Sequence, residues 1–227
     1  MTEKKCIYLI FSSTPLKMGA FIRYVTGERY NHLSLSLGCD LSTLYSFARK
    51  YRNTPFYGGF VRESAERFKN SGRFANIRIC AVPVTAEQYK AVARILFKMN
   101  SDPKKYRYNT ISAIFALRKK RIYIENSYTC IEFVVEILNQ CNITDKIKKE
   151  RFYSLSDLQN IFGDCIIYDG VFPNIEGNST ACNDTYSIRK NIALRYYLTA
   201  SANAGLIYLL LKSKRNKKKD GCTIFYN

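Results

Sequence analysis

The stretch "NHLSLSLGCDLSTLYSFA" (residues 31–48) alternates apolar and polar side chains, turns, and then alternates again. Leucines occupy every second position from Leu33, with small polar residues between them. Period-two alternation is typical of a strand that buries one face, and a glycine-containing turn between two such runs predicts an antiparallel pair. We therefore predict paired strands over 32–38 and 43–48.

The rest of the chain separates into segments of strand-like and helix-like period. Apolar runs predict further strands at 6–11, 60–63, 76–84 and 165–169. Helical spacing and capping residues predict helices at 15–27, 85–100, 109–120, 127–141 and 154–162. Because most strands precede most helices and one sheet would hold them, we expect an α+β fold.

The composition is that of a folded and strongly basic protein. The 227 residues are 47% hydrophobic and carry a formal net charge of +18. Such a charge favours anionic partners, for example an anionic membrane surface or an acidic polymer, although a merely solvated basic surface explains it as well. There is neither a ribonucleoprotein aromatic motif nor a zinc-finger spacing, so we expect no specific nucleic acid recognition.

The cysteines suggest reduced thiols and not a metal cluster. Eight cysteines are present without any C-x-x-C pair, and the chain has one histidine, so we expect neither a metal site nor another cofactor. The N-terminal "MTEKKCIYLIFSS" has an apolar core of about six residues, which is short for a signal peptide. It is better interpreted as a first strand, and we expect a cytoplasmic protein.

The character of the chain changes near residue 172. We expect one domain over 1–172 and a basic extension over 173–227. Within the extension, residues 196–211 are mostly apolar, but this stretch is shorter than the roughly 20 residues that cross a bilayer. The segment 193–219 is therefore interpreted as a packed helix, a membrane-surface helix aided by its lysines, or a tail anchor.

One cysteine stands where a helix is predicted to begin. Thr129 and Glu132 have capping-box spacing, which makes Cys130 the first helical residue, and Ser127 is an alternative cap that leaves it in the same turn. Unpaired first-turn amides and the helix dipole both favour the thiolate, the nucleophilic form, and the amides could donate to an oxyanion. The alternative is a buried core cysteine, because Cys130 shares its helical face with apolar residues.

The single histidine, His32, stands at the head of the alternating strand. The ordinary interpretation of such a position is a surface residue on the polar face of the strand. A general base acting on Cys130 is the functional alternative.

Four stretches together carry a resemblance to a known family: "YLIFSSTP", "YNHLSLSL", "LYSFARKYRNTPFYGGFVRE" and "YRYNTISAIF…ENSYTCIEFVVEIL". The chain resembles the circularly permuted papain-like, NlpC-type cysteine amidases and peptidases of the YiiX/YaeF kind, relatives of the lecithin–retinol acyltransferase-like proteins. The resemblance covers about residues 1–170. It implies a papain-like antiparallel sheet packed against helices, permuted so that the histidine strand precedes the cysteine helix.

The resemblance also implies roles for individual residues. Cys130 would be the nucleophile, and His32 the base that takes its proton and later protonates the leaving group of a thioester-forming reaction. Ser46 matches the position of the residue that orients the histidine. Relatives often carry His, Glu or Asn there, so this serine is a departure, and Glu63 is an alternative.

Substrate-binding residues are implied in the same way. Tyr106 and Tyr108 match the aromatic wall that such enzymes place near the cleft, although two tyrosines packed at a helix entrance would look the same. The 49–59 loop is a candidate lid, since Gly58 and Gly59 permit unusual backbone angles.

Three functions remain as hypotheses. The first is a cysteine hydrolase of the amidase or peptidase type, acting on a cell-wall peptide or a lipid-linked amide. The second is a membrane-associated lipid acyltransferase or thioesterase that uses the same pair and contacts an anionic membrane through 193–219. The third is a non-catalytic basic binding module.

Overall fold

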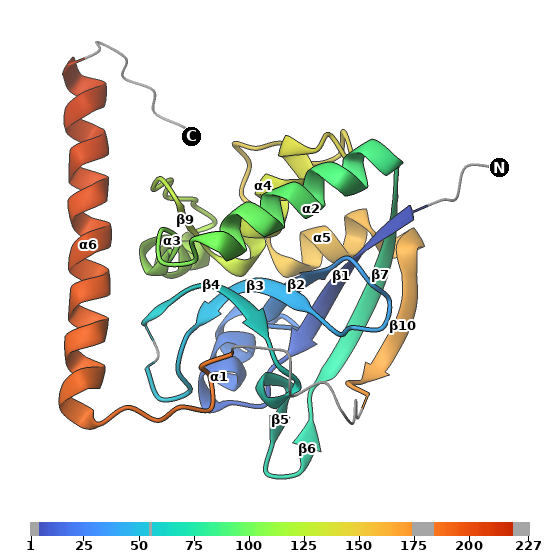
Figure 1. Ribbon diagram of the computed structural model, residues 1–227, viewed down its shortest axis with the longest axis horizontal. Helices are drawn as coiled ribbons and strands as arrows, with labels where there is room; N and C mark the ends of the chain where they lie inside the picture. The colour runs from blue at the N-terminus through green and yellow to red at the C-terminus, as the bar shows by residue number, and fades with distance from the viewer. Residues whose placement is uncertain (1–4, 55, 174–183, 220–227) are drawn as a thin grey trace.

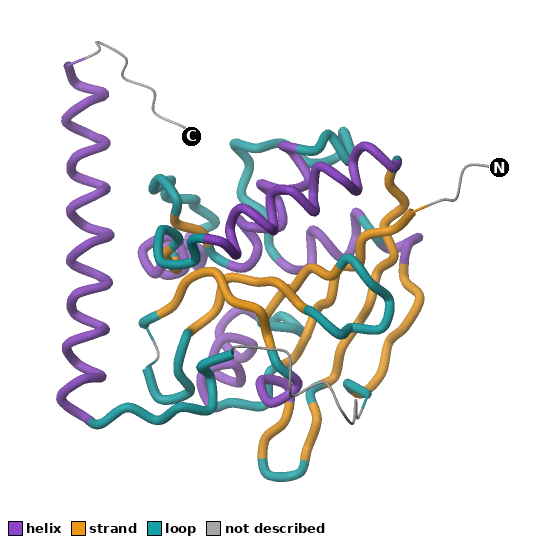
Figure 2. The backbone as a smooth tube through the Cα atoms, viewed as in Figure 1, coloured by secondary structure: helices purple, strands orange, loops and turns teal. Residues whose placement is uncertain are grey.

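A computed structural model describes residues 5–54, 56–173 and 184–219 of the chain. Its centre is an eight-stranded sheet in the order β10-β7-β1-β2-β3-β4-β8-β9, with helices on both sides (Figure 1, Figure 2). The strands of this sheet are β1 (Lys5–Ser13), β2 (His32–Ser36), β3 (Leu44–Arg49), β4 (Gly58–Glu63), β7 (Asn76–Val84), β8 (Arg107–Tyr108), β9 (Ser127–Tyr128) and β10 (Ile166–Val171). A separate hairpin joins β5 (Lys69–Asn70) to β6 (Arg73–Phe74).

The helices are α1 (Lys17–Thr26), α2 (Ala86–Ser101), α3 (Thr110–Phe115), α4 (Cys130–Gln140), α5 (Leu155–Ile161) and α6 (Ile192–Lys219). Three short 3-10 helices are η1 (Ala65–Phe68), η2 (Ala116–Arg118) and η3 (Gly163–Cys165). The α+β class predicted from the sequence is therefore confirmed. The sheet, however, is mixed and not wholly antiparallel, because β8 and β9 pair in parallel.

The sheet separates two cores, as strand alternation requires. Ile7, Leu9 and Phe11 of β1 point into the larger core, which α2, α4 and α5 cover, while Ile10 points into a smaller core on the other face. In Figure 1, α2 and α4 lie on one side of the sheet and α1 lies on the other. The β2–β3 pair therefore has α4 packed directly over it.

Local capping explains where the helices begin and end. Thr85 and Thr129 each complete a capping box, so α2 and α4 begin at the residues that the sequence predicts. Ser127, the alternative cap, belongs to β9. The helix expected over 109–120 is shorter, because it becomes 3-10 after Phe115 and ends at a left-handed Lys119.

The C-terminal part of the chain packs unevenly. Residues 184–190 lie against the loop that follows β3, whereas α6 runs along the side of the domain (Figure 1). Of its described side chains only Leu206 is fully buried, and Tyr196, Ile207 and Tyr208 are largely exposed. α6 thus packs on the domain along part of its length, through Leu206 and a hydrogen bond from Thr110 to Asn203, and leaves much of its apolar surface exposed. Within the described residues, no helix combines the length and the apolar character needed to cross a membrane.

The predicted boundary after residue 172 falls beside a segment, 174–183, that lies outside the described residues. Cys182 and Cys222 lie outside them as well. The six described cysteines are all free thiols.

Candidate active site

Cys130 is the first residue of α4, at the buried end of that helix. The Thr129 hydroxyl accepts from the Glu132 amide at 3.2 Å, and the Glu132 carboxylate accepts from the Thr129 amide at 2.7 Å. The Cys130 and Ile131 amides, also in the first turn, have no intrahelical acceptor. The Cys130 thiol therefore starts from a helical turn whose amides remain able to donate to a bound group.

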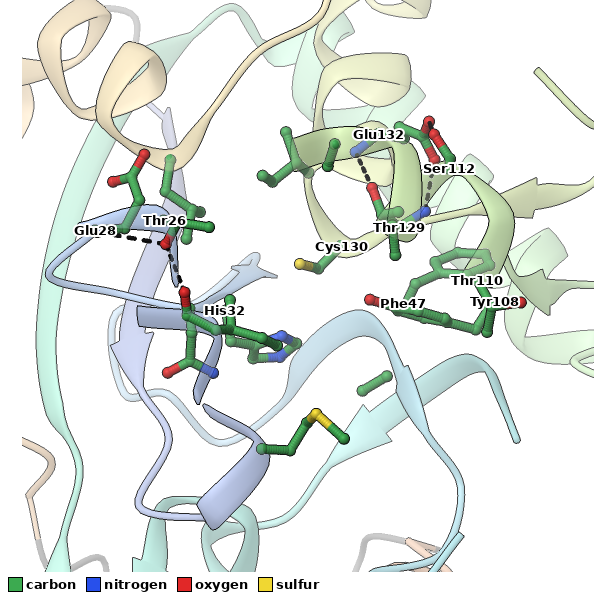
Figure 3. Close-up of a pocket in the computed structure, with 18 of the residues that line it drawn as sticks. Thr26, Glu28, His32, Phe47, Tyr108, Thr110, Ser112, Thr129, Cys130 and Glu132 are labelled. Atoms are coloured by element: carbon green, nitrogen blue, oxygen red, sulfur yellow. Dashed lines mark hydrogen bonds between the residues drawn. The ribbon is translucent and has the colours of Figure 1, made fainter. Parts of the chain in front are cut away.

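His32 is the first residue of β2 and is only 8% exposed, so the surface interpretation is wrong for this residue. Its Nε2 atom lies 2.7 Å from Oε1 of Glu63. Figure 3 shows the Cys130 side chain extending from the start of α4 toward the His32 imidazole. Burial alone would lower the pKa of His32, but the Glu63 carboxylate and the Cys130 sulfur raise it above its usual value.

Glu63 ends β4, and its side chain is 1% exposed. One carboxylate oxygen contacts His32, and the other accepts a short hydrogen bond from the hydroxyl of Ser34. Burial would raise the pKa of Glu63, yet the charge of His32, the hydrogen bonds and the Arg67 guanidinium lower it. The pair is thus an imidazolium and a carboxylate, and a buried charge pair of this kind is fixed in position by its hydrogen bonds.

Ser46 does not reach the histidine. Leu35 pairs with Tyr45, so antiparallel register puts Ser46 opposite Ser34 and not opposite His32. Ser46 is fully buried, and its hydroxyl has no hydrogen-bond partner among the described residues. The orienting position belongs to Glu63, which reaches His32 from two strands away.

The two tyrosines diverge. Tyr108 is half-buried and lines the cavity in front of Cys130. Burial, followed by the nearby Cys130 and Glu132, raises the pKa of Tyr108, so its hydroxyl stays protonated. Tyr106 instead lies in the aromatic core, with its ring centroid 6.5 Å from that of Phe47, and is not among the cavity-lining residues.

Gly58 and Gly59 belong to β4 and not to a mobile loop tip. A Cβ atom on Gly58 would lie 2.6 Å from the Ala48 carbonyl oxygen, and one on Gly59 would collide with the Tyr106 carbonyl. Among the described residues, the glycines with positive φ are Gly27 and Gly72. Gly58 and Gly59 therefore allow neighbouring strands to approach closely. Of these two, only Gly58 lines the cavity.

A cavity of about 1040 Å³ opens in front of Cys130, His32 and Glu63. The rest of the lining is mixed. Its basic side chains are Lys17, Arg49, Arg67, Lys119, Arg121 and Arg151, and its apolar side chains include Phe21, Ile22 and Val25 of α1, Phe56, Ala113, Ile114, Leu117, Ile131, Val135, Phe152 and Leu155. Several of these, including Phe21 and Leu117, are more than half exposed at its mouth. Ligand sites commonly combine such apolar walls with a few convergent polar groups.

Ser112 and Arg121 contact Glu132 in the first turn of α4. The Ser112 hydroxyl donates to Glu132 at 2.5 Å and itself accepts from the Ile122 amide at 3.2 Å. Arg121 lies 3.6 Å from the same carboxylate. The capping-box spacing predicted the role of Glu132, but nothing local in the sequence indicates Ser112 or Arg121.

Among the described residues, His, Cys, Asp and Glu side chains nowhere gather in the groups of three that hold a metal ion. No protein-family model, curated protein or solved structure matches this chain. The resemblance stated from the motifs therefore stays a prediction, and the site is interpreted from its own geometry.

Proposed function

We propose that the protein is a cysteine-dependent hydrolase of the amidase or peptidase type, on a permuted papain-like arrangement. The observation that carries the proposal is the contact series Cys130, His32 and Glu63 in the wall of one cavity. A nucleophile, a base in reach of it, and a third group that orients the base form the usual arrangement of nucleophilic catalysis.

The reaction begins from a thiolate on Cys130 beside the protonated imidazole of His32. The thiolate attacks the substrate carbonyl carbon, and the Cys130 and Ile131 amides stabilise the oxyanion that forms. The imidazolium then protonates the leaving amine as the C–N bond breaks, which leaves a thioester on Cys130. His32 next takes a proton from water, whose oxygen displaces the thiolate and releases the acid.

Glu63 supports both halves of this cycle. Its carboxylate stabilises the imidazolium and keeps the other ring nitrogen directed toward Cys130, because Nε2 is held by Glu63. The Ser34 hydroxyl holds the second carboxylate oxygen and so prevents Glu63 from rotating away.

A second candidate keeps the same chemistry and changes the substrate to a lipid acyl group. The apolar side chains of the cavity wall favour it, since an acyl chain would bury apolar surface that a hydrophilic peptide would not. The exposed apolar residues of α6 would then contact a membrane surface, with anionic lipid attracted by the basic chain.

Acyl-enzyme trapping with p-nitrophenyl esters tests both candidates. We expect a stoichiometric burst of nitrophenol from acetyl and decanoyl esters, and a matching mass increase on the peptide that contains Cys130. Cys130→Ala should abolish the burst, while Cys141→Ser, at a buried core cysteine, should leave it intact. A burst that survives in Cys130→Ala would exclude the proposed nucleophile.

Chain length then separates the two candidates. Each added methylene that becomes buried contributes about 0.8 kcal/mol, so a rate that rises steeply from acetyl to decanoyl supports the lipid acyl substrate. A rate that does not change with acyl chain length, together with cleavage of peptide amides, supports the amidase or peptidase. The absence of any burst would favour the non-catalytic binding module.

A further inference from the structure

A buried ion pair joins the C-terminal extension to the segment that follows Glu63. The Arg67 guanidinium donates to both oxygens of Asp184, from Nε to Oδ2 at 2.7 Å and from Nη2 to Oδ1 at 2.7 Å. The two side chains are 5% and 3% exposed. Such a bidentate pair fixes the orientation of the guanidinium plane as well as its distance from the carboxylate.

Asp184 also holds the backbone beside Glu63. Its Oδ2 atom accepts from the Ser64 amide at 2.9 Å and from the Ser64 hydroxyl at 3.0 Å. Ser64 is the next residue after Glu63, at the point where β4 ends and η1 begins. One carboxylate thus contacts both ends of the short segment from Ser64 to Arg67, which directly follows Glu63.

The residues after Asp184 continue along the same wall. Thr185 donates to the Lys50 carbonyl at 2.9 Å, and the Tyr186 carbonyl accepts from the Arg52 amide at 2.9 Å. The Arg67 guanidinium lies 4.5 Å from the centroid of the Tyr186 ring, and both side chains line the cavity. The start of the extension is therefore part of the wall in front of Cys130.

Charges alternate from the histidine outward along this chain of contacts. His32 meets Glu63, the Arg67 guanidinium acts on Glu63 from η1, and Arg67 meets Asp184. The other ionisable group that acts on His32 is Cys130, from α4. Each buried charge has an opposite charge as its neighbour, as low-dielectric surroundings require.

We propose that Asp184 is a positioning residue of the active site, which acts through Arg67 and Ser64 to keep the Glu63 carboxylate available to His32. With Asp184 in place, Arg67 is engaged and Glu63 keeps its negative charge directed at the imidazole. Without it, the buried guanidinium would keep only the Arg49 carbonyl as acceptor, at 2.8 Å from Nη1, and its uncompensated charge would turn to Glu63 and compete with His32 for the same carboxylate. The inference rests on the proposed function only in treating His32 as the catalytic base.

The single histidine of the chain makes this measurable, because its imidazole gives one NMR signal with no overlap from others. We would titrate His32 in the full chain for wild type and for Asp184→Asn, without substrate. In Asp184→Asn the Arg67 charge is no longer balanced by Asp184 and acts more strongly on Glu63. The His32 titration midpoint should therefore move down by about one pH unit. Asp184→Glu should restore a midpoint close to that of wild type, because it keeps the charge.

Thr85→Ala is the stability control. The Thr85 hydroxyl caps α2 by accepting from the Gln88 amide at 3.1 Å, and Thr85 is exposed and does not line the cavity. Its loss should lower stability without moving the His32 midpoint. If Asp184→Asn also lowers stability and leaves the midpoint unchanged, Asp184 is an ordinary structural residue and the proposal is overturned.

The double variant Arg67→Met/Asp184→Leu covers the case in which Asp184→Asn does not fold. Replacing a buried ion pair by apolar side chains of similar volume is often tolerated. Since it removes the competing guanidinium together with Asp184, the His32 midpoint should lie at or above that of wild type. A fall of about one pH unit in this double variant would show that Asp184 does not act through Arg67 and would contradict the proposal. A shift in His32 without any acyl-enzyme in wild type would instead defeat the proposed function alone.

Discussion

The Nε2 atom of His32 lies 2.7 Å from Oε1 of Glu63, and both side chains are buried between β2 and β4. This contact gives the histidine a fixed orientation and a stabilised positive charge. It links two residues that are 31 positions apart, across the intervening strand β3.

Replacing Glu63 should impair the chemistry far more than replacing Ser46. Glu63→Gln removes the charge that stabilises the imidazolium, so kcat/KM for a p-nitrophenyl ester should fall about 100-fold. Ser46→Ala should retain the wild-type value, since the Ser46 hydroxyl makes no described hydrogen bond. The reverse order of effects would return the orienting role to Ser46.

The pair also predicts how stability depends on pH. The pKa of His32 is raised from 6.5 to about 10, where burial opposes the shift and Glu63 causes it. The contribution of this raised pKa to the free energy of unfolding is complete below pH 6.5 and is lost as the pH rises toward 10. The pKa of Glu63 is lowered from 4.5 to about 2, where burial opposes the shift and His32 causes it, so its contribution is lost as the pH falls from 4.5 toward 2.

Both contributions are complete between pH 4.5 and 6.5. Urea unfolding of wild type and Glu63→Gln should therefore differ most at a pH of about 5.5, by about 3 kcal/mol, and less at a pH of about 9. Asp169→Asn serves as the control, because Arg78 and Asp169, which form an ion pair at 2.6 Å, both stay charged over this range. If the difference in the free energy of unfolding between wild type and Glu63→Gln grew from a pH of about 5.5 to about 9, the result would contradict the proposed ion pair.

Close packing at β4 makes one glycine sensitive to a single added carbon. Gly59→Ala would push a Cβ atom against the Tyr106 carbonyl, so we expect a loss of about 1–3 kcal/mol in the free energy of unfolding. Gly163→Ala is the matched control, because nothing lies within 4 Å of its Cβ position. Equal tolerance of both changes would show that the β4–β8 contact is looser than described.

The exposed apolar side chains of α6 predict association with anionic vesicles. Tyr196→Ser, Ile207→Ser and Tyr208→Ser together should weaken sedimentation with phosphatidylserine-containing vesicles about tenfold. The control is Phe97→Ser, which removes an exposed apolar ring from α2, a helix of the domain itself. If the triple variant and Phe97→Ser behave alike, α6 has no special role at a membrane.

Local rules predicted much of the site, and long-range register decided the rest. The capping box around Cys130 depends on four consecutive residues, so its position at the start of α4 is confirmed. The choice between Ser46 and Glu63 depends on how β2, β3 and β4 align, which the sequence alone leaves open. The Arg67–Asp184 pair spans 117 positions and has no local signal at all.

The short elements were missed for a related reason. Strands β8 and β9 have two residues each, too few to show any alternation, yet their parallel pairing sets the path of the chain from Tyr108 to Cys130. The sequence predicts a candidate lid over 49–59 because the Gly58–Gly59 pair permits unusual backbone angles. In the structure these two glycines lie in β4 and allow the neighbouring backbone at Ala48 and Tyr106 to come close.

The most direct test of the account is the alkylation of individual cysteines by limiting iodoacetamide at pH about 6, followed by mass spectrometry. In wild type, Cys130 should react far faster than Cys80, whose burial raises its pKa to about 11. In His32→Ala, Cys130 should lose this lead. If Cys130 is as inert as Cys80, or reacts equally fast without His32, the two residues do not form a catalytic pair.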